Sequence, residues 1–393
     1  MSETGRRESI QALGVVAAGN FVQLGSRFLV GALVPLVLTE FETGKSAVGL
    51  ALTGMWAIYA LGQFPSGVLA DRFGERRLLI AGLVGTVVGM ALIAVAPSLP
   101  LFALAVLTLG AGTGLYFAPG SSLLTRLFED AGGPLGWLTA AGAVAGVVYP
   151  TLGNAVGVRY GWEVAAGLAS VVAVPVLLGT LVATPTPEPA NSARRLGAAV
   201  DLDRIRATLA RPAVAYTTLL AVLVSFTFQG FTSFFTTFLV EYRGLDPGTA
   251  GIFFGGVFGI SSLAQPVGGW LSDRTSRDLA LGISITIAAS GLIVLLSVGG
   301  WQGVLAGSAV FGVGLSWPGT IQARIMDRFE DAERGYGFGL VRTVYMLLGA
   351  SGSVVVGTAA SVGGWQLGYA VPVAVLATAL LALGINRALG LGL

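Results

Sequence analysis

Long apolar runs recur along the whole chain, and short segments rich in charge, glycine or proline separate them. Each run has about 20 residues or more, the length that a helix needs to cross the ~30 Å hydrocarbon core of a bilayer. The ten-residue alternating segments that would indicate a membrane β-barrel are not seen in the sequence. The pattern therefore predicts an all-α membrane protein. Its 12 transmembrane helices are expected at 11–38, 47–70, 78–96, 101–125, 135–157, 162–183, 212–240, 247–271, 279–298, 302–324, 336–360 and 365–386.

The polar positions also divide the chain into two halves. One long polar stretch, rich in proline and charge, follows the sixth span and is the natural linker. The expected division is an N-terminal bundle at 1–183, a cytoplasmic linker at 184–211 and a C-terminal bundle at 212–393. The halves resemble each other, since QFPSGVLADR from Gln63 matches QPVGGWLSDR from Gln265. An even number of helices per half predicts two pseudo-symmetric six-helix bundles, related by an axis along the membrane normal.

Composition and charge agree with this picture and orient it. The chain is 54% hydrophobic and 11% charged, against about 25% charged residues in soluble domains. With both termini and the linker inside, 17 basic residues are cytoplasmic and three lie outside. The positive-inside rule therefore predicts a multi-pass plasma-membrane protein with both termini in the cytoplasm. The first apolar run lacks a small-residue cleavage site, so we expect that helix to remain.

Several kinds of chemistry are excluded by composition. Cysteine is absent, which excludes disulfides, thiolate metal sites and thiol catalysis. Histidine is absent too. A net charge of +2, scattered among loops, does not indicate a nucleic-acid partner. No nucleophile and base constellation is visible, so we expect no enzyme activity, no cofactor and no metal. The expected partners are the lipid bilayer and a small-molecule substrate, bound by a monomer, with the coupling ion left open.

Two motifs carry a resemblance to a known family. GVLADRFGERR, Gly67 to Arg77, resembles the loop between the second and third helices of the major facilitator superfamily, whose pattern is roughly G-x-L-a-D-r-x-G-r-r. GAVAGVVYPTLG is similar to the fifth-helix motif of that family. GGWLSDRTSRD is a degenerate second copy of the loop, in which Thr275-Ser276 replace the apolar-Gly pair. The resemblance covers essentially the whole chain and implies secondary transport by alternating access.

The loop motif predicts a cytoplasmic gate. A carboxylate at a helix end can cap a neighbouring helix or pair with arginine, and the resemblance suggests the start of the eleventh helix as the target of Asp71. We expect Arg72, Arg76 and Arg77 to pair with Glu129 and Asp130, and Arg274 and Arg277 to pair with Glu330, Asp331 and Glu333. The alternative is that the arginines only fix topology. The predicted gate residues are Gly67, Asp71, Arg72, Gly74, Arg76, Arg77, Glu129, Asp130, Asp273, Arg274, Glu330 and Asp331.

Arg27 lies near the middle of the first span. A charge at that depth costs at least ~2.5 kcal/mol, so it usually faces a wet cavity and marks a pathway. Asn20, Gln23 and Arg27 are spaced by three and four and share one helical face. All acidic residues lie outside the spans or near helix ends, so Arg27 invites an anion that its planar fork can bind. The alternative is that Arg27 contacts backbone carbonyls or stacks on an aromatic ring.

A second polar stripe lies in the seventh span, where Gln229 is 202 positions after Arg27. Organophosphate antiporters and anion:cation symporters of the resembled family carry a first-helix arginine eight residues before a proline, a spacing that Arg27 and Pro35 reproduce. Gln229 replaces the second arginine of phosphate-ester exchangers, which disfavours sugar-phosphate exchange. Arg342 is expected either to bind substrate or to belong to the gate. The candidate substrate-binding residues are Arg27, Gln23, Gln229, Tyr59, Tyr149, Tyr345 and Arg342.

The sequence thus predicts a secondary active transporter of a small organic anion, carboxylate-like in charge. An exporter of lipophilic drugs is the main alternative, favoured by the fifth-helix motif and the phenylalanine-rich seventh span. A receptor or membrane enzyme on the same scaffold is a further alternative.

Overall fold

The computed structural model describes residues 3–186, 202–330 and 333–393, with side chains from residue 7 onward. Within these ranges every regular element is a helix, and no strand occurs. The apolar runs dictate this result, because a backbone surrounded by lipid must satisfy its hydrogen bonds within its own helix.

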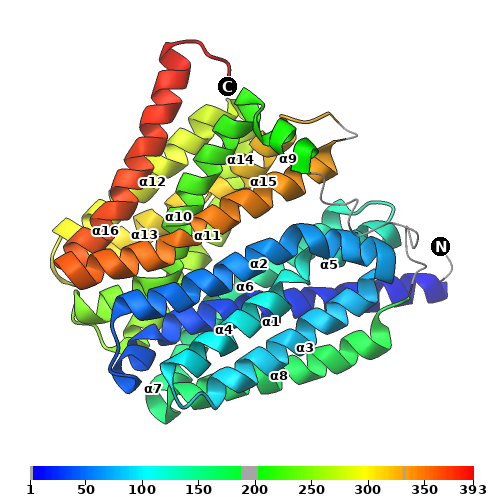
Figure 1. Ribbon diagram of the computed structural model, residues 1–393, viewed down its shortest axis with the longest axis horizontal. Helices are drawn as coiled ribbons and strands as arrows, with labels where there is room; N and C mark the ends of the chain where they lie inside the picture. The colour runs from blue at the N-terminus through cyan, green and yellow to red at the C-terminus, as the bar shows by residue number, and fades with distance from the viewer. Residues whose placement is uncertain (1–2, 187–201, 331–332) are drawn as a thin grey trace.

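The N-terminal half contains six membrane spans and occupies the lower part of Figure 1. Four of these spans are single helices, one is divided in two, and one contains a π-helical turn. They are α1 (Glu3–Glu40), α2 (Lys45–Phe73), α3 (Glu75–Ala94), α4 (Leu99–Gly114) with α5 (Phe117–Leu127), α6 (Gly132–Val148) with η1 (Tyr149–Gly153) and α7 (Asn154–Tyr160), and α8 (Trp162–Ala183).

The C-terminal half occupies the upper part of Figure 1. It begins after a short helix, α9 (Leu202–Leu209), which lies in the predicted linker; residues 187–201 of that linker are outside the described ranges. The spans are α10 (Pro212–Glu241), α11 (Pro247–Arg274), α12 (Arg277–Ser297), α13 (Gly300–Gly314) with α14 (Trp317–Met326), and α15 (Arg334–Gly349) with α16 (Ser351–Ala388). The prediction of twelve spans in two pseudo-symmetric bundles is confirmed.

The fourth and tenth spans break at equivalent places. Two non-helical residues separate α4 from α5, and two separate α13 from α14. Each break comes shortly before a proline, Pro119 or Pro318, which has no N–H for the carbonyl four residues earlier. The breaks bring Phe117 and Trp317, the first residues of α5 and α14, to the wall of a cavity between the halves.

The last two spans are joined more tightly than the sequence predicts. Helical hydrogen bonding continues through α16, and the turn between the spans is reduced to Gly363 and Gly364. Gly364 has φ +71°, a conformation that favours glycine because other residues carry a Cβ that clashes there. The first span also begins earlier than predicted, at Glu3.

The two halves pack together mainly through α1 against α10, through α2 against α15 and α16, and through α6, η1 and α7 against α11. We call the side where α2 begins the Lys45 face, and the side where α1 begins and α8 ends the linker face. Toward the Lys45 face the backbones nearly touch, since an ideal Cβ on Gly31 would lie 2.1 Å from the carbonyl oxygen of Thr232. Lys45 and Glu241 form an ion pair there.

Each half also contains an ion pair near the linker face in which one partner is buried. In the N-terminal half, Glu75 at the start of α3 is 2% exposed, and its Oε1 lies 2.9 Å from Nη1 of Arg126 in α5. In the C-terminal half, Arg324 of α14 is buried and pairs with Asp278 at the start of α12. Both pairs join the third span of a half to its fourth span, so each of them stabilises packing within one half.

Candidate functional site

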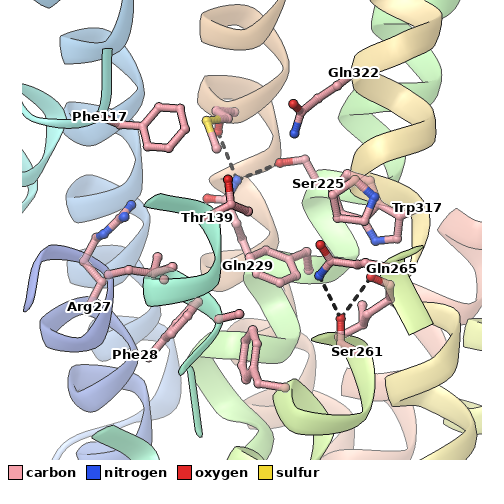
Figure 2. A pocket seen from close by; sticks show the side chains of 18 of the residues that line it. Arg27, Phe28, Phe117, Thr139, Ser225, Gln229, Ser261, Gln265, Trp317 and Gln322 are labelled. Atoms are coloured by element: carbon pink, nitrogen blue, oxygen red, sulfur yellow. Dashed lines mark hydrogen bonds between the residues drawn. The ribbon is translucent and has the colours of Figure 1, made fainter. Parts of the chain in front are cut away.

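A cavity of about 300 Å³ lies between the halves. Its wall is built from α1, α2, α5 and α6 on one side and from α10, α11, α14 and α15 on the other. Figure 2 shows Arg27 and Phe117 on one side and Gln265, Ser261 and Trp317 opposite. Five of the seven predicted substrate-binding residues line it, namely Arg27, Tyr59, Gln229, Arg342 and Tyr345.

Arg27 is 5% exposed and lines the cavity from α1. Its Nε donates a hydrogen bond to the carbonyl oxygen of Gln23, 3.4 Å away. Its guanidinium carbon lies 3.7 Å from the ring centroid of Tyr59 and 5.0 Å from that of Trp56. The backbone contact and the stacking expected from the alternative interpretation are therefore both present, and the side chain also faces the cavity.

Arg342 lines the same cavity from the opposite half. Its guanidinium carbon lies 4.7 Å from the ring centroid of Phe117, and its buried Nε has no hydrogen-bond partner in the described part of the chain. The Tyr59 phenol interacts electrostatically with both Arg27 and Arg342. No carboxylate is among the described residues that line the cavity. Two positive groups thus share a partly desolvated space with no neutralising acid among its described lining residues.

Gln229 is held in one orientation by α10 and α15. Its Nε2 donates to Ser225 Oγ at 2.9 Å and to the carbonyl oxygen of Met346 at 3.1 Å. Close packing requires Gly349, because an ideal Cβ there would lie 2.4 Å from Ser225 Oγ. The Oε1 atom of Gln229 is buried and has no partner in the described chain.

Gln23 and Tyr149 do not line the cavity. An α-helix turns by about 100° per residue. Viewed along the axis of α1, the cavity-lining residues Asn20, Leu24 and Phe28 lie to one side of Arg27, and Gln23 lies about 40° to the other side. Tyr149 packs on a different side of α1, with its ring centroid 5.3 Å from that of Phe21. It contributes to a separate apolar pocket of about 210 Å³ next to α8. These two residues are therefore not brought to the predicted site.

Sequence reasoning missed the aromatic residues of the wall. Phe28 and Phe258 have ring centroids 4.4 Å apart, and Phe228 and Trp317 are 6.2 Å apart. Aromatic residues in apolar spans usually pack in the core, so the residue type alone does not indicate which of them line a cavity. The position of Trp317 directly before Pro318 is a usable signal, since a helix break exposes side chains to a cavity.

Two of the predicted gate residues in the first half, Arg76 and Asp130, have partners other than the predicted ones. Arg76 donates to Thr186 Oγ1 at 2.7 Å and to the carbonyl oxygen of Leu181, so it secures the end of α8. Asp130 Oδ1 accepts a hydrogen bond from the amide of Gly132, the first residue of α6, at 3.1 Å. The expected pairing of Arg76 with Asp130 is therefore wrong in this conformation, because each side chain reaches a nearer partner.

In the second half, Arg277 pairs with Asp273 at 2.5 Å and with Asp327 at 3.0 Å. Glu333 pairs with Arg211 at 2.8 Å, and the guanidinium of Arg211 lowers the pKa of that exposed carboxyl. Arg274 lies over the ring of Trp270. The predicted pairing of Arg277 with Glu333 is not formed, and Asp331 lies outside the described residues.

Comparisons with known proteins agree with this architecture. The family model for the Major Facilitator Superfamily matches residues 16–321 and 219–388. A "Nitrite extrusion protein" of Bacillus subtilis (strain 168) is 24% identical over 74% of this chain and 71% of its own length. A "Probable nitrate/nitrite transporter NarK2" of Mycobacterium tuberculosis is 28% identical over 63% of this chain and 62% of its own length, less than two thirds.

Among solved structures, a bacterial homologue of the human lysosomal transporter Spinster, in an inward-facing and occupied conformation, superposes with a TM-score of 0.79. It is 16% identical, with 98% of each chain covered. At this identity the likeness describes the fold alone.

Proposed function

The chain belongs to the Major Facilitator Superfamily, and from this premise we propose that it is a secondary active transporter of a small organic anion. The anion carries a charge like that of a carboxylate. It is transported by alternating access, in which the central cavity opens in turn to each side of the membrane. The two bundles, 1–183 and 212–393, are the bodies that rock about the cavity, with 184–211 as their linker. Both termini lie in the cytoplasm and the protein resides in the plasma membrane.

One observation carries the proposal: Arg27 and Arg342, from opposite halves, line one cavity whose described lining contains no carboxylate. An anion between two guanidinium groups gains charge-assisted hydrogen bonds that are strengthened by the low local dielectric. The unpartnered Nε of Arg342 is a donor that such an anion can satisfy. The names of the two relatives, a nitrite extrusion protein and a probable nitrate/nitrite transporter, also support an anionic substrate.

A lipophilic-compound exporter is the second candidate. The aromatic wall formed by Phe28, Phe228, Phe258 and Trp317 favours it. The pair of cavity arginines disfavours a cationic compound, because like charges repel in a poorly solvated site.

The two candidates are separated by transport into proteoliposomes and by thermal-shift assays. Carboxylates, phosphate esters, neutral sugars and lipophilic cations are tested with the wild-type protein, Arg27→Gln and the control Arg159→Gln, whose side chain is exposed outside the cavity. We expect a response to anions that Arg27→Gln abolishes and Arg159→Gln retains. An anion response preserved in Arg27→Gln, or a response to lipophilic cations alone, would contradict the proposed function.

A further inference from the structure

We propose that the cavity wall formed by α10, α11 and α14 is a second, uncharged subsite, and that the substrate is a hydroxylated monocarboxylate. Its carboxylate is held by Arg27 and Arg342, and its hydroxyl groups bind the opposite wall. This inference rests on the proposed function and narrows its substrate class.

Gln229 supplies the main evidence. Both hydrogens of its amide nitrogen are used, on Ser225 Oγ and on the Met346 carbonyl. A carbonyl can only accept, so the amide cannot be reversed without losing the bond to Met346. The Oε1 atom is therefore fixed as a buried acceptor without a partner in the described chain. A carboxylate or an inorganic oxyanion has no hydrogen to offer this atom, whereas a hydroxyl group can donate one.

The other polar residues of this wall are neutral. Ser261, Ser262, Gln265 and Gln322 all line the cavity. Gln265 Nε2 donates to Ser261 Oγ at 3.3 Å, and Ser261 Oγ donates to the Leu315 carbonyl at 3.1 Å. In Figure 2, Gln265 and Ser261 lie across the cavity from Arg27. Amide and hydroxyl groups without a charge suit ligand hydroxyls, which donate and accept, better than a second ionic group.

Aromatic rings also line the cavity on this side. Phe228 and Trp317 line it with their ring centroids 6.2 Å apart. Such rings pack against the C–H bonds of a carbon skeleton. The cavity volume, about 300 Å³, is within the range of pockets for small organic ligands. An inorganic oxyanion at the arginines would leave the neutral wall without a ligand contact.

The expected selectivity follows from the unpaired acceptor. A site that is built to hydrogen-bond a ligand group discriminates against analogues that lack the group, because its own polar atom then stays unpaired. The corresponding loss of affinity is roughly five- to 150-fold.

The test measures binding of nitrate, propionate, lactate and gluconate to the full-length protein in detergent, by calorimetry. Propionate lacks a hydroxyl, lactate has one and gluconate has several. The variants are Gln229→Met, Gln265→Met, Arg27→Gln and the control Gln366→Met, whose exposed side chain lies outside the cavity. We expect lactate and gluconate to bind roughly five- to 150-fold more tightly than propionate and nitrate. The preference should disappear in Gln229→Met and persist in Gln366→Met.

Equal affinity of the wild-type protein for propionate and lactate would overturn the inference, and so would a preference that survives in a folded Gln229→Met variant. If Gln229→Met does not fold, the Gln265→Met variant is used for the test. It should weaken the binding of gluconate more than the binding of propionate, and an equal effect on both ligands would contradict the subsite. If the wild-type protein shows no preference for hydroxylated ligands but Arg27→Gln still weakens anion binding, only this inference is refuted. Anion binding that is indifferent to Arg27→Gln refutes the proposed function.

Discussion

The Nζ atom of Lys45, at the start of α2, lies 2.8 Å from Oε2 of Glu241, at the end of α10. The same oxygen accepts a hydrogen bond from Nε1 of Trp365 at 3.0 Å, and the lysine ammonium lies 5.4 Å from the centroid of that ring. This link joins the two halves at the Lys45 face. An opening of that face must separate Lys45 from Glu241.

Glu241→Gln should therefore favour opening of the Lys45 face. The pair is partly exposed, with 22% and 38% side-chain exposure, so the shift should be less than about fivefold. Opening of this face is measured by introducing a cysteine at Leu38, which is buried there. The rate at which an impermeant maleimide labels this cysteine increases when the face opens, and the chain has no other cysteine. Glu40→Gln, an exposed neighbour, is the control. Equal labelling in Glu241→Gln and wild type would show that the ion pair does not hold the face closed.

Arg342→Gln should weaken anion binding without destabilising the protein. The buried Nε of Arg342 has no described hydrogen-bond partner, and removal of the charge relieves repulsion from Arg27. Loss of a charge-assisted bond to the ligand should reduce affinity roughly ten- to 150-fold. Calorimetry and thermal unfolding of the ligand-free protein measure the two effects. A clear drop in unfolding temperature would indicate that Arg342 has a structural role instead.

Gly31→Ala should disturb the packing of α1 on α10. The added Cβ would lie 2.1 Å from the carbonyl oxygen of Thr232, and forced overpacking typically costs 1–3 kcal/mol. Gly14→Ala, in the same helix with nothing within 4 Å, should be neutral. We expect a lower unfolding temperature, or faster labelling of a cysteine at Leu38, for Gly31→Ala alone. Matching results for both variants would refute the close contact.

The contact between Glu333 and Arg211 should contribute stability that depends on pH. Arg211 lowers the pKa of Glu333, so the contribution is present above the ordinary glutamate pKa of about 4.3 and is lost as pH falls through the lowered value. Glu333→Gln should thus lower the unfolding temperature at neutral pH and have no effect well below pH 4. Glu129→Gln, an exposed residue, is the control. A difference that is constant with pH would contradict this assignment.

The twelve spans were predictable because each apolar run is long enough to cross a bilayer and is flanked by charge or glycine. The inward direction of Arg27 was also predictable, since a charge that deep is costly against lipid. Its partners were not. Tyr59 reaches Arg27 from α2 of the same half, whereas Arg342 approaches it from α15 only after the two halves pack.

The ion pairs near the linker face show why the gate was harder to predict. Charged side chains at helix ends have several partners within reach, and small rotations of a helix decide between them. Arg76 turns toward α8, while its neighbour Glu75 turns inward to Arg126. The sequence shows that acids and arginines alternate there, but not which of them is buried.

The ion pairs Glu75–Arg126 and Asp278–Arg324 each hold two spans of one half together. These pairs resist relative movement of the third and fourth spans within a half. We therefore expect a conformational change on ligand binding to occur mainly at the contact between the two halves. Substitutions in these ion pairs should then lower the unfolding temperature alone, whereas substitutions between the halves should also change how readily the Lys45 face opens.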